Sequence, residues 1–448
     1  MHIRHTAKTL SFIAAGALVL AGCSNSNSSS DDSSNSASSG QAANDDGHEH
    51  EGDEAKEVSK LQPRVVLSHD GGLVTLDGTT GKVLAETKHE GFLRLNPAGD
   101  GRHVLVTDSD RFRLFDTGLI KEPHEDHFHY YTKDPELTKA EIKAPKAGHV
   151  VTHDGYTSVF SDGKGTVQTL KSDAFSDGKI TDDEISTIST GEAHHGVAVP
   201  LGNGNLLVTK GTEDERNTIQ LVDEKGNVID ETTDCPGIHG EAAAQHNEYG
   251  DVVSFGCTNG SVVFRDGAFH KVPVPEEYQR SGNQFGSEAS PITLTDYKVD
   301  EDAELERPTR IGLLDTTTAT MSTVDLGSAY WFRSLARGEN GEALVLTYDG
   351  NLNIIDPNTG EVTRKVKVVE PWKEKSDWQE PGPNVKTSGD YAYVTEPASK
   401  KLHMIQISTG ELLSSWDLKV VPNEMAVVNG DPEAPDAEAS ASEGGSTE

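Results

Sequence analysis

Short apolar segments recur along most of this chain, and their spacing constrains the fold more than any other feature. They are separated by turns rich in Gly, Asp and Asn, and no long segment shows 3.6-residue periodicity. A phrase that ends in a Thr-Gly turn recurs at Asp77–Gly81, Asp356–Gly360 and Ile407–Gly410. Four short strands repeated every ~40–50 residues are typical of a β-propeller, in which each blade packs on its neighbours. The sequence therefore predicts an all-β fold.

The number of blades follows from the predicted innermost strands. These are expected to begin near Leu93, His149, His195, His239, Ser287, Arg333, Val385 and Glu424. The last one lacks outer strands of its own, whereas residues 64–88 supply outer strands without an inner one. We therefore expect one β-propeller over residues 61–429, closed by pairing of its N- and C-terminal strands. Eight blades are expected, with seven as the alternative, because insertions at 119–145 and 271–290 blur the repeat.

Residues 1–23 have the pattern of an export signal. Basic residues precede an apolar run, which ends in Leu20-Ala21-Gly22-Cys23. This ending resembles the lipobox of bacterial lipoproteins, which implies cleavage before Cys23 and a lipid on its sulfur. A transmembrane anchor is the alternative, but the apolar run is shorter than the ~20 residues that span a bilayer. We therefore expect an extracytoplasmic protein anchored to the cell membrane by lipid, on the cell surface or in the periplasm.

Two segments outside the repeats have few large apolar side chains. Residues 24–60 are rich in Ser, Asn, Asp and Glu, and residues 430–448 in Pro, Ala, Ser, Gly and acids. Such compositions bury too little apolar surface to offset chain entropy. We expect a disordered tether and a disordered acidic tail.

The charge of the chain excludes one class of partner. Lys and Arg total 39, Asp and Glu total 74, and the formal net charge is −35. This charge repels nucleic acid and favours cations. Nucleic acid is therefore not an expected partner. We expect a monomer that binds metal cations.

Three histidines occupy equivalent positions in successive repeats. His149, His195 and His239 each fall about one repeat apart, at the predicted start of an inner strand. Equivalent inner positions of a propeller line its central channel, so the three rings should meet at one mouth. Three imidazoles and a carboxylate, histidine or water complete the tetrahedral shell of Zn²⁺. The alternative is that these histidines fill the channel and bond to backbone carbonyls.

Other histidines could add ligands. His194 adjoins His195, but neighbours on a strand point to opposite faces, so His195 is preferred. The remaining candidates are His153, which follows His149 by four residues; His124, His127 and His129 in a long insertion; and His48 and His50 in the predicted tether. The insertion could cap the channel and donate the fourth ligand, and the tether could collect metal weakly. An exposed polar loop and a solvated linker are the respective alternatives.

Cys235 and Cys257 are the cysteines that remain besides Cys23. Export implies an oxidising compartment, where a disulfide is allowed; metal ligation is the alternative. A hairpin turning near Asn247 to Gly250 would bring Cys257 back towards Cys235. The predicted disulfide would stiffen the loop that presents His239.

Several phrases resemble one known family. They are Glu192–Ala198, Cys235–Glu241 and Phe255–Cys257, which are similar to phrases of the AztD family of periplasmic zinc metallochaperones. The resemblance covers most of 60–430. It implies a propeller, zinc in or near its channel, a disulfide, a mobile N-terminal histidine segment, and delivery of zinc to the solute-binding protein of an ABC importer. His195 and His239 match best, then His149; the lipobox is a departure that leaves the periplasmic setting open.

Three functions are compatible with these observations. A zinc metallochaperone is favoured, because the chain has no hydrolase elbow, phosphate loop or dinucleotide fingerprint. A metal-dependent propeller enzyme, a lyase or hydrolase, would need a carboxylate base near the metal. Glu241 and Glu288 lie near inner strands, but each is more simply a satisfied channel residue. A metal-free interaction scaffold is the third possibility.

Overall fold

The computed structural model describes residues 55–125 and 127–432. The chain divides into two units, Met1–Glu49 and His50–Glu448, and all described residues belong to the second. The predicted export signal, Cys23, His48 and His50 lie outside the described residues. No helix in the described stretches has the length and apolar character needed to cross a bilayer.

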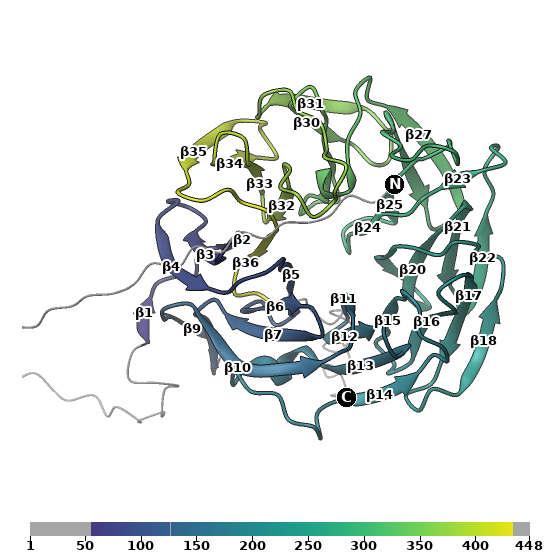
Figure 1. Ribbon diagram of the computed structural model, residues 1–448, viewed down its shortest axis with the longest axis horizontal. Helices are drawn as coiled ribbons and strands as arrows, with labels where there is room; N and C mark the ends of the chain where they lie inside the picture. Colours follow the sequence, from purple (N-terminus) through teal and green to yellow (C-terminus); the bar gives the residue numbers. More distant parts are fainter. Residues whose placement is uncertain (1–54, 126, 433–448) are drawn as a thin grey trace, which may run out of the picture. The chain divides into compact units, whose positions relative to one another are not determined.

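Strands dominate the described residues. They form seven four-stranded sheets, one five-stranded sheet and one three-stranded sheet. In Figure 1 the four- and five-stranded sheets follow one another around a common centre. The prediction of an all-β fold is confirmed.

Each sheet is built largely from strands that are consecutive in sequence. The first four sheets contain β2 Arg64–His69, β3 Gly72–Asp77, β4 Val83–Lys88 and β36 Met425–Val428; β5 Arg94–Pro97, β6 His103–Asp108, β7 Arg111–Asp116 and β10 Glu136–Lys143; β11 Ala147–His153, β12 Tyr156–Ser161, β13 Thr166–Lys171 and β14 Ser186–Ser189; and β15 Ala198–Pro200, β16 Leu206–Gly211, β17 Arg216–Val222 and β18 Val228–Thr232.

The other sheets follow the same plan. They contain β19 Glu241–Asn247, β20 Gly250–Cys257, β21 Asn259–Arg265 and β22 Ala268–Val272, with β23 Gln279–Arg280 beside β21; β24 Gln284–Phe285, β25 Ile292–Asp296, β26 Arg310–Asp315 and β27 Thr320–Asp325; β28 Leu335–Arg337, β29 Ala343–Leu346, β30 Asn351–Ile355 and β31 Val362–Lys367; β32 Val385–Ser388, β33 Tyr391–Glu396, β34 Lys401–Gln406 and β35 Leu412–Asp417; and the three-stranded β1 Lys56–Val58, β9 His127–Thr132 and β8 Leu119–His124. Two short 3₁₀ helices are η1 Ser172–Phe175 and η2 Phe332–Ser334.

The recurring Thr-Gly phrase is the turn between the two outer strands of a sheet. Asp77 Oδ1 accepts hydrogen bonds from the backbone N–H groups of Thr79 and Thr80, at 3.0 and 2.8 Å. Gly81 then adopts a positive φ of +69°, which glycine reaches without a Cβ penalty. The phrase therefore marks the same structural position in the three sheets that contain it.

Buried apolar side chains fill the spaces between neighbouring sheets. Val199 and Leu207, for example, share a cluster with Phe255 of the next sheet. Another cluster joins Leu67 of β2 to Tyr393 of β33, so residues near opposite ends of the chain pack together. Because each sheet has two apolar faces, its stability depends on its neighbours.

Strands from the two ends of the predicted repeat region, β2 and β36, share one sheet, as the sequence predicts. β2 pairs antiparallel with β36, and Arg64 lies opposite Val428.

Two details of the sequence analysis differ from the structure. Part of the predicted tether forms β1, which pairs with β9, and the inner strand expected near Ser287 is β24, which begins at Gln284. β1 forms because it pairs with β9 of a hairpin that is distant in sequence, and local composition does not reveal such pairing.

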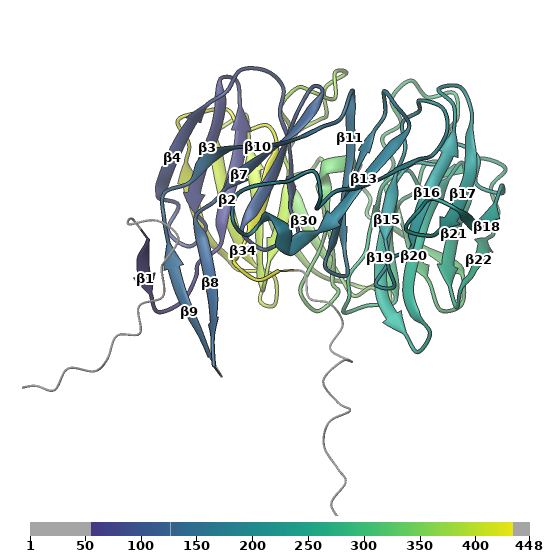
Figure 2. The ribbon, with the colours of Figure 1, turned by 90° about the horizontal axis from the view of Figure 1, so that it is seen from below.

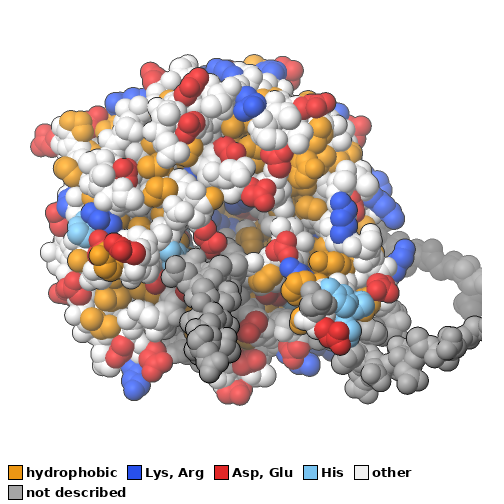
Figure 3. Space-filling model, turned by 180° about the vertical axis from the view of Figure 1, so that it is seen from behind, with side chains coloured by type: hydrophobic (Ala, Val, Ile, Leu, Met, Phe, Trp, Pro, Cys, Tyr) orange, Lys and Arg blue, Asp and Glu red, His pale blue; other side chains and the backbone are white. Residues whose placement is uncertain are grey.

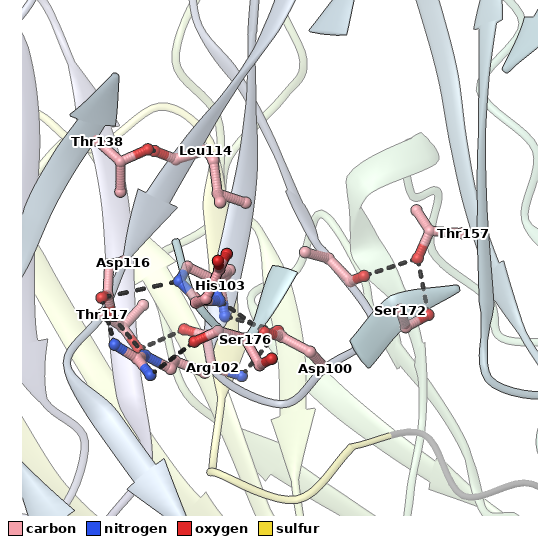
Figure 4. A network of polar contacts seen from close by, with 12 residues as sticks. Asp100, Arg102, His103, Leu114, Asp116, Thr117, Thr138, Thr157, Ser172 and Ser176 are labelled. Carbon is pink, nitrogen blue, oxygen red and sulfur yellow. Dashed lines mark hydrogen bonds and ion pairs between the residues drawn. The ribbon is translucent and has the colours of Figure 1, made fainter. Parts of the chain in front are cut away.

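The β8–β9 hairpin extends beyond the sheet that precedes it, as Figure 2 shows. A buried ionic network holds its base (Figure 4). Asp116, at the end of β7, accepts hydrogen bonds from Arg102 Nε and Nη2 at 2.9 and 2.7 Å, and Lys133 Nζ lies 2.9 Å from it. His103 lies between Asp116 and Asp100, with its Nδ1 2.5 Å from Asp100 Oδ2.

The charges of this network shift two pKa values. Burial alone would raise the pKa of Asp116, but hydrogen bonds and charges from His103 and Arg102 hold that pKa far below its usual range. Burial would lower the pKa of His103, and the hydrogen bonds and charges of Asp100 and Asp116 outweigh it, so the pKa of His103 is raised. The network thus stabilises the charged forms of both partners.

Candidate metal centre

Three successive sheets bring His149, His195 and His239 together. His149 lies in β11, whereas His195 and His239 lie in the segments that precede β15 and β19. The ring centroids are 4.9, 5.3 and 5.7 Å apart, and ligand atoms of all three lie within 4.8 Å of one another. Nε2 of His149 is 3.2 Å from Nε2 of His195. Zinc bound at ~2.0–2.1 Å in a tetrahedron holds its ligand nitrogens ~3.3 Å apart, so the arrangement fits this ion.

Each ring also faces an oxygen on its other nitrogen. His195 Nδ1 lies 2.6 Å from Oδ2 of Asp162, which directly follows β12. His239 Nδ1 donates to the carbonyl oxygen of Gly282 at 2.5 Å. His149 Nδ1 lies 3.5 Å from Oε1 of Glu241, at the start of β19. Outer oxygens of this kind fix the ring orientation and tautomer of metal-binding histidines, and they leave Nε2 available for the ion.

Burial keeps His149, His239 and Glu241 uncharged at neutral pH. It lowers the pKa of His149 and of His239 to about 3, with a further contribution from the neighbouring imidazoles. It raises the pKa of Glu241 to about 8, although His195 opposes the shift. Glu241 Oε2 is buried and has no hydrogen-bond partner. Neutral imidazole is the form that binds metal, so His149 and His239 are ready to do so at neutral pH.

A glycine adjoins each of the three histidines, and each is needed for close packing. A Cβ on Gly148 would lie 2.2 Å from Oδ1 of Asp162, and one on Gly196 would lie 2.2 Å from the ring of Phe160. Gly240 has a φ of +84°, and a Cβ there would lie 2.6 Å from the Gly282 carbonyl oxygen. These glycines let the histidine segments approach their outer partners. Adjacent His and Gly residues in the sequence therefore indicate where this site lies.

A disulfide holds the segment that carries His239. Cys235 and Cys257 are bonded, with their Cα atoms 4.9 Å apart, so the predicted pairing is present. The backbone N–H of His239 donates to the carbonyl oxygen of Gly256 at 3.1 Å, which ties the same segment to β20. The hairpin turns at Asn247 and Gly250, as predicted.

Replacing both cysteines by serine should lower the free energy of unfolding by about 3 kcal/mol, because the bond closes a loop between residues separated by 22 positions. Denaturant unfolding measures this difference. Reducing the unaltered protein should give a similar loss. Equal stability of the oxidised protein and the Cys235→Ser, Cys257→Ser variant would contradict the expectation.

Among the described residues, the other predicted ligands do not belong to this three-histidine group. His194 is buried, and its ring nitrogens face the carbonyl oxygens of Glu192 and Thr209 at 2.8 and 3.2 Å. His153 belongs to a different group, with His246 and Asp251. The sequence analysis considered both as additional ligands but preferred His195 over His194, and neither His194 nor His153 belongs to the three-histidine group.

The hairpin histidines form an exposed group of their own. His124, His127 and His129 have ring centroids 5.0 to 5.1 Å apart, and Nε2 of His127 lies 3.2 Å from Nε2 of His129. His129 Nδ1 lies 3.3 Å from Glu57 of β1. Figure 3 shows a histidine patch on this face of the molecule. The expected pair His127 and His129 does share a side, but the group does not join His149, His195 and His239 as a fourth ligand.

Sequence reasoning missed several side chains that lie in or beside the histidine groups. Asp162, His246 and Asp251 were not singled out, and Glu241 was interpreted as a satisfied channel residue, whereas its Oε2 has no hydrogen-bond partner. Asp162 directly follows β12 and lies 33 residues before its partner His195 in the chain, and no motif links the two residues. Its only sequence signal is the acidic turn that follows Phe160-Ser161.

Known proteins support the comparison with zinc chaperones. No family model matches the chain. The zinc chaperone AztD of Citrobacter koseri is 23% identical over 378 residues, which cover 82% of this chain and 86% of that protein. A crystal structure of Citrobacter koseri AztD has a TM-score of 0.71 at 22% identity and covers 84% of this chain and 99% of its own. The apo form has a TM-score of 0.70 at 21% identity, with coverage of 83% and 98%.

The curated relative is named as a zinc chaperone. The resemblance that the sequence predicts is confirmed: this chain is similar in sequence to the zinc chaperone AztD, and its fold is similar to that of the AztD crystal structures.

Proposed function

We propose that this protein is an extracytoplasmic metallochaperone that holds Zn²⁺ through His149, His195 and His239 and passes it to the solute-binding protein of a zinc ABC importer. The observation that carries the proposal is the convergence of three imidazoles whose Nδ1 atoms face oxygen. Zinc is the cargo, and this donor set matches its preference for nitrogen.

The proposed scaffold is an eight-bladed propeller closed by the sheet of β2, β3, β4 and β36. Eight apolar clusters support it, because each one bridges two neighbouring sheets. The cluster of Leu67 and Tyr393 supplies the last of these connections. In this scaffold the three histidines lie at the mouth of the central channel, each at the inner edge of its blade.

The centre suits transfer because it has room for one more ligand. Three Nε2 atoms leave the fourth position of a tetrahedral ion to water or to a donor from the acceptor protein. The His195 side chain is 36% exposed, whereas that of His149 is 18% exposed, so an incoming ligand would approach from the His195 side. Two carboxylates lie beside the rings, and each faces an Nδ1 atom: Asp162 faces that of His195, and Glu241 faces that of His149.

The setting follows from the N-terminal sequence. The lipobox ending in Cys23 would anchor the mature chain to the outer surface of the cell membrane. The net charge of −35 favours metal cations over anionic partners. We expect a monomer that meets its acceptor at this membrane surface.

The transfer itself is tested by mixing the zinc-loaded protein with the zinc-free solute-binding protein in the presence of a chelator. The zinc content of both proteins is followed by mass spectrometry under native conditions. We expect a transfer rate that rises with acceptor concentration and exceeds zinc loss to the chelator alone. Transfer no faster than that loss would argue against direct delivery.

Replacing Asp162 by Asn should weaken zinc binding by about 10–100-fold, because the outer partner of His195 Nδ1 loses its charge. Competition against a chelator of known affinity measures the change. The matched control is Asp182→Asn, at an exposed turn, which should bind zinc as tightly as the unaltered protein. Equal affinity of the two variants would show that Asp162 does not support the centre.

A further inference from the structure

Charged side chains occupy equivalent places on four neighbouring sheets that do not contribute to the three-histidine centre. Arg333 lies in η2, directly before β28, and Lys386 is the second residue of β32. Glu424 directly precedes β36, and Arg94 begins β5. β28 contacts β32, β32 contacts β36, and β36 contacts β5, so the four places follow one another. Figure 1 shows β32, β36 and β5 next to the common centre of the sheets.

The carboxylate of this group is already paired. Arg333 Nη2 donates to Glu424 Oε1, and the two side chains are only 4 and 8% exposed. Arg333 Nη1 donates to the carbonyl oxygen of Trp378 at 3.0 Å, while its Nε is buried without a hydrogen-bond partner. Glu424 therefore balances the charge of Arg333 and cannot also balance the charges of the other two cations.

Those other cations, Lys386 and Arg94, lack an anionic partner. Among the described residues, neither the ammonium of Lys386 nor the guanidinium of Arg94 makes a hydrogen bond or an ion pair. The Arg94 guanidinium lies 5.8 Å from the centroid of the Trp378 ring, and both cations are half-buried. Burial lowers the pKa of Lys386; the charge of Glu424 opposes this shift, and the charges of Arg94 and Arg333 add to it.

The excess of positive charge is local, and there is room beside it for a ligand. The chain as a whole has a formal net charge of −35, so a group of three cations with one carboxylate does not reflect its composition. Charges that are withdrawn from water are costly unless they are paired. Lys386 lines a cavity of about 1040 Å³, which extends to Glu241 beside the three-histidine centre. A small anion could enter this cavity and pair with the unbalanced cations.

We propose that Arg94, Arg333 and Lys386 form a binding site for a small divalent oxyanion, either a phosphate or a dicarboxylate. Both kinds of anion match the excess charge, and both present oxygens that suit the planar fork of a guanidinium. Arg94 and Lys386 would donate hydrogen bonds to the anion, and Arg333 would hold the carboxylate of Glu424 away from it. The inference goes beyond the proposed function, because the site needs neither zinc nor an acceptor protein.

The test is calorimetric titration of inorganic phosphate, and separately of succinate, into the full-length protein at low ionic strength. Zinc is first removed with an uncharged phenanthroline chelator, so that neither anion can bind through a metal ion. The variants are Lys386→Met and Arg94→Gln, which remove one charge each; Arg333 is kept, because its loss would leave Glu424 buried and unpaired. The matched control is Lys225→Met, at an exposed turn. Circular dichroism establishes that each variant is folded.

We expect the unaltered protein to bind one equivalent of at least one of the two anions, and the tighter of the two identifies the class of ligand. Lys386→Met and Arg94→Gln should each weaken this binding by at least ~10-fold, because each removes a charged hydrogen-bond donor. Lys225→Met should bind as tightly as the unaltered protein. If one site variant unfolds, the other carries the test. Binding of neither anion, or equal affinity in the folded site variants and the control, would overturn the inference.

Discussion

Replacing His195 by Ala should weaken zinc binding by at least ~100-fold. The variant removes one of three protein ligands, whereas loss of an outer partner alone costs about 10–100-fold. The hydrogen bond to Asp162 is lost at the same time, which leaves a half-buried carboxylate without its imidazole partner. Competition titration with a zinc chelator measures the affinity.

The neighbouring histidine provides the sharpest comparison. His194→Ala removes an imidazole one residue away whose nitrogens contact backbone carbonyls. It should lower the free energy of unfolding, because it leaves a cavity and frees the buried carbonyl of Thr209, but the folded variant should keep its zinc affinity. Equal zinc affinities for His195→Ala and His194→Ala would contradict the assignment of His195 as a ligand.

Replacing Asp116 by Asn should lower the free energy of unfolding by about 3–5 kcal/mol, because it leaves buried positive charge without its partner. Arg102 and Lys133 both contact Asp116, and the Asp116 side chain is 2% exposed. Denaturant unfolding measures the loss, with Asp182→Asn as the exposed control. A loss no larger than that of the control would show that the network adds nothing to stability.

The same network predicts how stability depends on pH. The raised pKa of His103 means that its stabilising contribution is complete below the ordinary value of 6.5 and is lost as pH rises through the higher folded value. The lowered pKa of Asp116 acts in the other direction: its contribution is complete above the ordinary value of 3.8 and is lost only in strong acid. Asp116→Asn should therefore reduce the decline in stability above neutral pH.

The repeat pattern was enough to predict the all-β fold class and the proximity of three histidines in the candidate site. Because each blade repeats one pattern of strands, histidines at the same phase in successive repeats had to lie near one another, as His149, His195 and His239 do. The same reasoning predicted that β2 would pair with β36. Pairing of Cys235 with Cys257 followed from the hairpin between them.

The features that the sequence did not reveal depend on contacts between distant segments or on local irregularity. The carbonyl of Gly282 reaches His239 from a loop that carries no side-chain signal. His246 lies with His153 and Asp251 because the register of β19 is irregular, and a strict alternation of side chains would place His246 on the wrong face. β1 forms only because β9 offers a partner strand. Such placements follow from the assembled sheets and not from local propensity.

Diffraction from a zinc-soaked crystal, with data collected on both sides of the zinc absorption edge, tests the central claim most directly. We predict an anomalous peak enclosed by His149, His195 and His239, with ~2.0–2.1 Å from the ion to each Nε2 atom. Zinc bound elsewhere in a crystal in which these three rings remain without an ion would contradict the account.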